Sequence, residues 1–287
     1  MESMMFMSVN KEIAACKRQI FIDCFLNDGE IQRFISGLKE QGLSAGTVRN
    51  ICNVLHGAMS KAKEYDYISV NPCAGIHLPK IERKEARILT VCEQKELERV
   101  AKKDKNGFAI LLASYTGLRI GEICGLTWDD VDLENRMLHV SRTIRRVQCH
   151  EPEAPAKTAV VIGSAKSGRS ERRIPLPSRI LELFEEHQNT STGKYVFDHR
   201  GRPLEPRTLQ YRFKVLLKKA GLADINFHAL RHTFATRCLE LRFDIKTLSE
   251  VLGHASAKMT LDRYGHSQMD HKRQVMDTLD GLFDRSA

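Results

Sequence analysis

Residues 228–236 read His228-Ala229-Leu230-Arg231-His232-Thr233-Phe234-Ala235-Thr236, and their pattern predicts a helix over 228–241. His228 and Arg231 lie three residues apart, so they share one face of that helix and can contact the same phosphate. His232 is about 100° from Arg231 around the helix axis, and we interpret it as a buried, hydrogen-bonding histidine. A separate apolar stripe faces the predicted core and consists of Leu230, Phe234, Cys238 and Leu241.

A second arginine stands in the motif Thr116-Gly117-Leu118-Arg119-Ile120-Gly121-Glu122. The predicted helical region over 107–126 breaks at Gly117 and resumes at Arg119. Because a helix start offers free N–H groups and a positive dipole end, an arginine there adds to an anion site. Glu122, one turn later, is placed to hold the Arg119 guanidinium. A plain surface ion pair between the two residues is the alternative.

Two more motifs follow, Leu252-Gly253-His254 and Thr260-Leu261-Asp262-Arg263-Tyr264-Gly265-His266. His254 lies just past a predicted helix at 245–252, where the negative end of the dipole favours imidazolium. Tyr264 ends a predicted helix at 257–264, and its phenol is a candidate nucleophile, although an ordinary amphipathic tyrosine fits the same position. His266 and His271 lie nearby but lack the spacing of a zinc motif, so no metal site is predicted.

Lys166 falls in a turn between predicted strands at 159–163 and 171–176, which follow a longer predicted strand at 136–147. Lys-Ser-Gly commonly serves only to make a turn. In a phosphodiester-cleaving site, however, a mobile lysine can protonate the leaving 5′-oxygen, because an alkoxide leaves poorly. Arg169 and Arg172, close to Lys166 in sequence, are candidate DNA contacts. Further helices are predicted at 178–187, 206–220 and 267–283.

The first part of the chain reads as helical. Gly42 ends a predicted helix over 29–41 with Ile31, Phe34, Ile35 and Leu38 on its apolar side, and Ser44 caps the next over 45–65. The second helix presents a polar stripe that is either a solvated face or a surface laid along DNA, formed by Arg49, Asn53, His56 and Ser60. A polar linker at 79–84 precedes a capping box, Thr90 and Glu93, that opens a helix over 91–103. We therefore expect domains at 1–84 and 85–287.

Composition narrows the class of protein. The 287 residues carry 45 basic and 36 acidic side chains, for a net charge of +9, and this balance favours a polyanionic partner. No apolar run approaches the roughly 18 residues of a membrane span, and the start lacks the pattern of a signal peptide. The eight cysteines never form a C-x-x-C pair, as is typical of reduced thiols in a cytoplasmic protein.

Taken together, Arg119, Lys166, His228, Arg231, His254 and Tyr264 occur in the order and local contexts of the tyrosine recombinases, and the chain resembles this phage-integrase family from about residue 29 onward. The resemblance implies an α+β, mainly helical protein, with an all-α core-binding domain and a mixed α/β catalytic domain containing a small antiparallel sheet. Arg119, Arg231 and His254 would bind the scissile phosphate, Lys166 would act as general acid, and His228 would assist. Tyr264 would form a 3′-phosphotyrosyl bond, without metal or ATP.

The same resemblance implies the partners. These are double-stranded DNA, a homotetramer on two DNA sites that recombines them through a Holliday junction, and accessory DNA-bending or excision factors. The enzyme would act in the bacterial cytoplasm at the nucleoid. The sequences of residues 43–50 and 71–73 are similar to those of integrases of phages and conjugative transposons. Too few residues precede 29, however, to hold both an arm-binding domain and a full first helix. The alternatives are a type IB topoisomerase-like enzyme and a non-catalytic DNA-binding relative.

Overall fold

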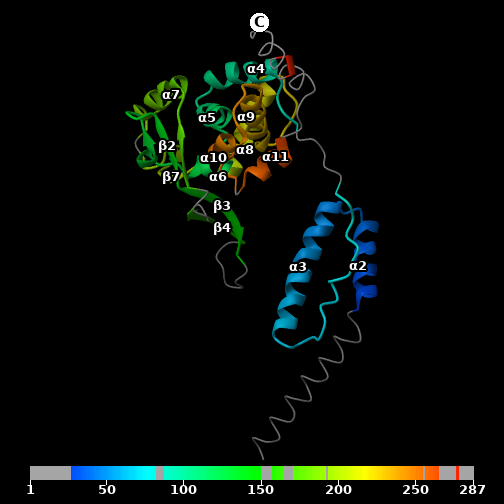
Figure 1. Ribbon diagram of the computed structural model, residues 1–287. Helices are drawn as coiled ribbons and strands as arrows, with labels where there is room; N and C mark the ends of the chain where they lie inside the picture. Colours follow the sequence, from blue (N-terminus) through cyan, green and yellow to red (C-terminus); the bar gives the residue numbers. More distant parts are fainter. Residues whose placement is uncertain are drawn as a thin grey trace, which may run out of the picture. The chain divides into compact units, whose positions relative to one another are not determined.

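The structure is a computed structural model (Figure 1), and it describes residues 27–81, 87–149, 157–164, 171–191, 193–254, 256–264 and 276–277. The chain divides into two compact units, residues 1–85 and 86–287, one residue from the boundary expected from the sequence. Within the described ranges, no helix has both the length and the apolar character that a membrane crossing requires.

The described part of the smaller unit contains two helices, α2 (Asp28–Glu40) and α3 (Ala45–Glu64). Each begins with a side-chain cap, as the sequence predicts for α3: Asn27 accepts from the Glu30 N–H, and Ser44 accepts from the Thr47 N–H. The core between the helices consists of Ile31, Ile35, Leu38, Val48, Cys52 and Cys73. Phe34, predicted on the same apolar side of α2, is 45% exposed.

The larger unit is mainly helical, so the predicted α+β class is confirmed. Its helices are α4 (Val91–Lys102), α5 (Phe108–Thr116), α6 (Ile120–Gly125), α7 (Ser178–Gln188), α8 (Pro206–Lys219), α9 (His228–Glu240), α10 (Ile245–Leu252) and α11 (Ala257–Tyr264). The capping box of Thr90 and Glu93 opens α4 as predicted. The predicted helix at 267–283 falls almost wholly outside the described residues.

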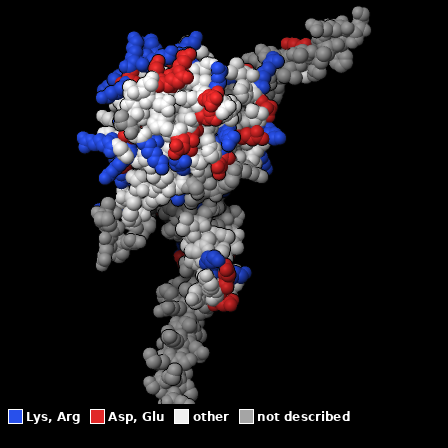
Figure 2. Space-filling model, turned by 90° about the vertical axis from the view of Figure 1, so that its left-hand side faces the viewer, with Lys and Arg blue, Asp and Glu red and all other residues white. Residues whose placement is uncertain are grey.

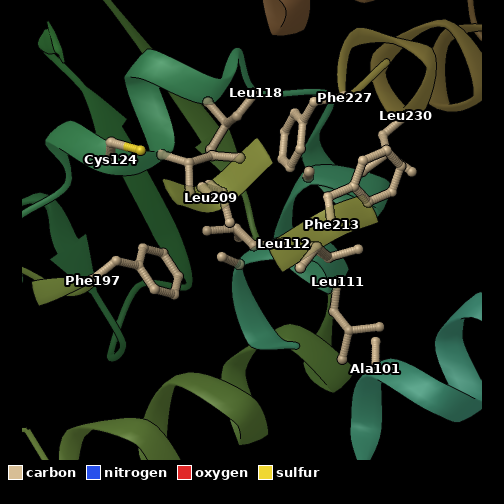
Figure 3. Packing of buried hydrophobic residues seen from close by; sticks show 14 of the residues in the cluster. Ala101, Leu111, Leu112, Leu118, Cys124, Phe197, Leu209, Phe213, Phe227 and Leu230 are labelled. Atoms are coloured by element: carbon tan, nitrogen blue, oxygen red, sulfur yellow. The ribbon is translucent and has the colours of Figure 1, made fainter. Parts of the chain in front are cut away.

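The core of the larger unit surrounds α5, whose residues from Ala109 to Ser114 are all buried. Figure 3 shows Leu111 and Leu112 of this helix packed among apolar side chains from α8 and α9 and their connection, including Phe213, Phe227 and Leu230. A helix that is apolar on all sides requires neighbours all round. Leu241, predicted to face the core, is instead 74% exposed, because α9 ends at Glu240 and Leu241 turns away as its cap residue.

The strands form three small antiparallel sheets. Strands β1 (Val131–Asp132), β2 (Met137–Val140) and β5 (Arg172–Pro175) make one sheet in the order β1-β2-β5, after a short 3-10 helix η1 (Trp128–Asp130). Strands β3 (Arg142–Gln148) and β4 (Thr158–Ser164) pair as a ribbon that projects from the body of the unit (Figure 1). The third sheet pairs β6 (Asp198–His199) with β7 (Arg202–Pro203) and was not predicted.

The strand predicted over 136–147 is therefore two strands that separate at Ser141. The first half pairs with β5 and the second half pairs with β4, so the chain changes partner between Val140 and Arg142. In the second pairing, Arg142 lies opposite Ser164. The ribbon thus brings the chain back to the body of the unit two residues before Lys166, which lies outside the described residues.

The break between α5 and α6 requires glycine. Gly117 has a φ of +63°, and a Cβ at this position would lie 2.5 Å from Cδ1 of Phe234 in α9 and 2.9 Å from Cδ2 of Leu252 in α10. A positive φ and this close approach both exclude a larger residue. The chain can therefore turn against the middle of α9 and the end of α10, and Arg119 follows as the residue that caps α6.

Candidate active site

Arg231 links the ends of two helices. It lies in the first turn of α9 and is only 2% exposed. Its Nη1 donates to the carbonyl oxygen of Gly117 at 2.8 Å, and its Nη2 donates to the carbonyl oxygen of Leu252 at 2.7 Å. A guanidinium carries five N–H donors in a planar fork, so an arginine can hold backbone carbonyls and an anion together.

Arg119 reaches the same place from the start of α6. Its Nη1 forms an ion pair with Oε1 of Glu122 at 2.7 Å, and its Nη2 donates to the carbonyl oxygen of Gly253 at 3.1 Å. The other oxygen of Glu122 accepts from the Arg119 backbone N–H at 2.8 Å. Glu122 holds the guanidinium, as expected, but it is buried, so the pair is not the exposed surface ion pair that was the alternative.

Arg172, a predicted DNA contact, is held within the protein by its own partners. Its side chain is only 7% exposed and points into the protein. Its Nε donates to the carbonyl oxygen of Val251 at 2.6 Å, and its two terminal nitrogens bind the two oxygens of Glu122 at 3.1 and 3.0 Å. The alternation of β5 explains the difference, because Arg172 points inward while the adjacent Arg173 is exposed.

Three arginines from three separate segments therefore bind three successive carbonyl oxygens at the end of α10. Arg172 binds that of Val251, Arg231 that of Leu252 and Arg119 that of Gly253. The last carbonyls of a helix have no partner within it and lie at the negative end of its dipole, so cations are the natural donors there. We call these three side chains, with Glu122, the arginine frame.

Glu122 is the acidic member of the arginine frame. Burial raises the pKa of its carboxyl group, but hydrogen bonds and positive charge from Arg172, together with the charge of Arg119, outweigh the burial and hold the pKa below its ordinary value. The carboxylate is therefore ionised at neutral pH. It neutralises part of the charge that would otherwise separate the two guanidiniums.

Gly253 connects the arginine frame to His254. Its φ is +64°, and a Cβ here would lie 2.9 Å from Nη1 of Arg172. A glycine with this positive φ is a common helix C-cap, and Gly253 caps α10. His254 follows directly and is 7% exposed, and its Nδ1 lies 2.7 Å from Oγ1 of Thr260 in α11. Thr260 has no exposed surface and was not identified from the sequence, although its position one turn before Tyr264 was a usable signal.

His228 and His232 stack edge to face in the first turns of α9, with ring centroids 4.7 Å apart. His228 is exposed and Arg231 is buried, so their common helix face runs from solvent into the protein. His232 is half-buried, and it packs against the ring of His228. His232 therefore contacts the ring of an exposed residue, whereas the sequence suggested a buried, hydrogen-bonding histidine.

The remaining catalytic candidates differ in what the structure describes of them. Tyr264 is the last residue of α11, the helix that Thr260 joins to His254, and its side chain is outside the described set. Lys166 and Arg169 lie in the segment 165–170, which is also outside it. Arg119, Arg231 and His254 are brought together at the end of α10, and His228 lies one turn from Arg231.

The polar stripe of α3 consists of two kinds of residue. Arg49 donates from Nε to the carbonyl oxygen of Pro79 at 2.8 Å, so part of its guanidinium holds the segment that packs back on α3. Ser60 accepts from the Asn71 amide at 2.9 Å and remains exposed. Asn53 and His56 are exposed as well. The stripe is accessible to a partner, but Arg49 also has a local structural role.

Metal and thiol chemistry are not indicated by the described residues. Across these ranges, no group of three or more His, Cys, Asp or Glu side chains is arranged to hold a metal ion. Burial raises the pKa of the Cys124 thiol to about 12 and that of Cys238 to about 11. Both thiols stay protonated at neutral pH and act as small apolar side chains.

Comparison with known proteins identifies the family. The family model described as "Phage integrase family" matches residues 82–271, a range that contains every catalytic candidate. The chain belongs to the phage integrase family. It is 32% identical over 276 residues to a "Tyrosine recombinase XerC-like" protein of Caldanaerobacter subterraneus subsp. tengcongensis, covering 88% of this chain and 71% of that protein.

Integrases of mobile elements match this chain over a similar share of its length. The ICEBs1 integrase of Bacillus subtilis is 26% identical, over 88% of this chain and 70% of its own length. Among solved structures, the Tn1549 transposon integrase in complex with transposon right end DNA superimposes with a TM-score of 0.75 at 26% identity, over 89% of this chain and 86% of that one. The phage integrase now described is thus a tyrosine recombinase of the conjugative-transposon type, an enzyme of site-specific DNA recombination.

Proposed function

We propose that this recombinase cleaves duplex DNA by attack of Tyr264 on a phosphodiester held by Arg119, Arg231 and His254. The observation that carries the proposal is the convergence of these three side chains at the end of α10. Two guanidiniums and an imidazole can donate hydrogen bonds to the non-bridging oxygens, where negative charge increases in the transition state. In this family the product of the attack is a 3′-phosphotyrosyl bond, which retains the energy of the broken ester.

Two proton transfers accompany the cleavage step. The phenol of Tyr264 loses a proton as its oxygen bonds to phosphorus, and the 5′-oxygen of the leaving strand gains one. We assign donation to the 5′-oxygen to Lys166 and assistance in proton transfer or phosphate contact to His228. The released 5′-hydroxyl then attacks the phosphotyrosyl bond of the partner strand, so two strand exchanges through a Holliday junction restore every ester.

Double-stranded DNA is the substrate in this proposal. Its support is the net charge of +9, the exposed stripe on α3 and the similarity to solved integrases that are bound to DNA. Figure 2 shows lysine and arginine side chains gathered at the upper and left margins of one face of the larger unit, with acidic side chains between them. Because phosphate contacts release counterions, binding should weaken steeply between low and moderate salt, and a flat salt dependence would argue against these contacts.

The assembly belongs to the same proposal. We assign residues 1–84 to core binding and 85–287 to catalysis, with the two domains engaging one DNA site. Four copies on two sites would form the active tetramer, and residues 267–283 would dock on a neighbouring copy. Accessory DNA-bending or excision factors would set the direction of recombination at the bacterial nucleoid, in the cytoplasm.

A nicked suicide substrate tests the chemistry, because loss of a short 5′-hydroxyl fragment traps the covalent adduct. The wild-type protein should accumulate the adduct, and Tyr264→Phe should bind the DNA with unchanged affinity and form none. Tyr211→Phe is the matched control, since Tyr211 is an exposed tyrosine of α8 in the same unit. Adduct formation by Tyr264→Phe at the wild-type level would show that another residue is the nucleophile.

A further inference from the structure

The contact between His254 and Thr260 takes no direct part in the proposed cleavage reaction. The two side chains are almost completely buried, and Nδ1 of His254 lies 2.7 Å from Oγ1 of Thr260. They belong to different elements, since His254 follows α10 and Thr260 lies in the middle of α11. A short hydrogen bond between buried groups, one in the loop after α10 and one in α11, fixes the orientation of both.

The position of Thr260 within α11 gives this bond a second consequence. Thr260 and Tyr264 are four residues apart, so they lie one turn from each other on the same side of the helix. A bond that anchors Thr260 therefore also anchors the turn from which Tyr264 extends. His254 is in turn connected through Gly253 to the arginine frame, because Gly253 accepts from Arg119 and packs against Arg172.

The same contact constrains the chemistry of the imidazole. When Nδ1 is bound by a hydroxyl group, the ring is held in one orientation, and Nε2 is the nitrogen on its opposite side. A neutral imidazole that accepts at Nδ1 carries its proton on Nε2, and an imidazolium carries one there too. With the Thr260 hydroxyl as the donor to Nδ1, Nε2 can therefore donate to a non-bridging oxygen of a bound phosphate in both protonation states.

We propose that Thr260 is a positioning residue for recombination, whose hydroxyl group holds Nδ1 of His254 and so joins the phosphate-binding histidine to the helix that carries Tyr264. This inference rests on the proposed role of His254 at the phosphate. Thr260 touches neither DNA nor the reacting atoms in this assignment. It acts only through the imidazole of His254, so a change at Thr260 should have no further effect once that imidazole is removed.

Single-turnover cleavage of the suicide substrate is the measurement, made with the full chain from pH 6 to 9. Thr260→Val keeps the shape of the side chain and removes the hydroxyl. Loss of a buried hydrogen bond of this kind costs about 1–3 kcal/mol, so cleavage should slow by roughly 10- to 100-fold while DNA affinity stays unchanged. Thr260→Ser, which retains the hydroxyl, should recover most of the rate, and the apparent pKa of the pH–rate profile should shift only in Thr260→Val.

Two further variants distinguish a positioning role of Thr260 from a general effect on the stability of the protein. In His254→Ala the hydrogen bond is already lost, so adding Thr260→Val should slow cleavage no further. Thr233→Val is the matched control: Thr233 is buried, and its hydroxyl donates to the carbonyl of Ala229 and accepts from the N–H of Leu89. It should lower the melting temperature without shifting the pH–rate profile.

Three outcomes would overturn the inference: wild-type cleavage by Thr260→Val, no recovery in Thr260→Ser, or additive losses in the double variant. Failure of the underlying assignment would look different. If His254→Ala cleaves at the wild-type rate, then His254 does not bind the phosphate, whatever Thr260 does.

Discussion

The polar stripe of α3 and the arginine frame of the larger unit use polar side chains in opposite ways. On α3, Asn53, His56 and Ser60 are exposed and have few partners within the unit. In the arginine frame, Arg172 and Arg231 are buried, and each donates to a backbone carbonyl. An exposed side chain can adapt to a ligand at low cost, whereas a buried guanidinium is already ordered when the ligand arrives. The first arrangement suits binding, and the second suits catalysis.

The largest effect is expected from Arg231→Lys, which keeps the charge and removes the planar fork. The donors of an ammonium lie on a single nitrogen, so it cannot span both carbonyls and also present two parallel N–H groups to a phosphate; cleavage should fall by about 100- to 1,000-fold while DNA affinity is retained. The free energy of unfolding should also fall, by roughly 1–3 kcal/mol, since a buried carbonyl loses its donor. Single-turnover cleavage, gel-shift binding and urea unfolding measure the three quantities.

The control for that experiment is Arg99→Lys, which alters an exposed arginine of α4 paired with Glu96. It should leave all three measurements unchanged. Near-wild-type cleavage by Arg231→Lys would remove Arg231 from the phosphate site and would end the contrast between the two regions.

The next effect compares two neighbouring arginines on β5. Arg172→Met removes the donor to Val251 and two bonds to Glu122, so the arginine frame loses its connection to the sheet. Cleavage should fall by about 10- to 100-fold, and the free energy of unfolding by about 3 kcal/mol, because Glu122 loses a buried partner. Arg173→Met alters an exposed residue and should leave stability unchanged. Equal stability of the two variants would show that Arg172 is not part of a buried frame.

A smaller effect concerns acid stability. The pKa of Glu122 is lower in the folded protein than its ordinary value of 4.5, so the folded state binds the proton less readily than the unfolded state. The stabilisation is present above the ordinary value and is lost as the pH falls through the folded pKa. Urea unfolding between pH 7 and 3 should therefore show a loss of stability below about 4.5 that is weaker in Glu122→Gln. A steeper loss in that variant would contradict the assigned direction.

The smallest effect is expected on α3. Asn53→Ala should weaken DNA binding by less than about tenfold, as one polar contact at an exposed site is worth around 1 kcal/mol. The melting temperature and the single-turnover rate at saturating DNA should not change. His56→Ala is the companion variant on the same face. If either variant abolishes cleavage at saturation, the stripe does more than bind.

Local signals predicted most of the helix boundaries. Ser44 and the capping box at Thr90 act through bonds within a few residues, and the glycines at 117 and 253 have the positive φ that commonly ends a helix, so the sequence alone indicates these boundaries. The pairing of Arg119 with Glu122 was predictable for the same reason, being three residues apart.

Long-range partners explain what the sequence did not predict. Arg172 and Arg173 look equivalent until the pairing of β5 with β2 decides which one points inward, and the partner of Arg172 is Glu122, fifty residues earlier. The division of the strand at Ser141 depends on two different partner strands. The bond from Thr260 to His254 joins α11 to the loop that follows α10, and no periodic pattern in the sequence predicts it.

The way α10 ends has one more consequence, for the entry of the substrate. A bare helix C-terminus repels an anion, so His254 would be poorly placed to receive a phosphate beside it. Here three permanent positive charges cover that pole, and among the described residues of the arginine frame Glu122 is the one carboxylate that opposes them. The electrostatic field at the end of α10 is thereby reversed. This position then attracts a phosphate of the DNA backbone instead of repelling it.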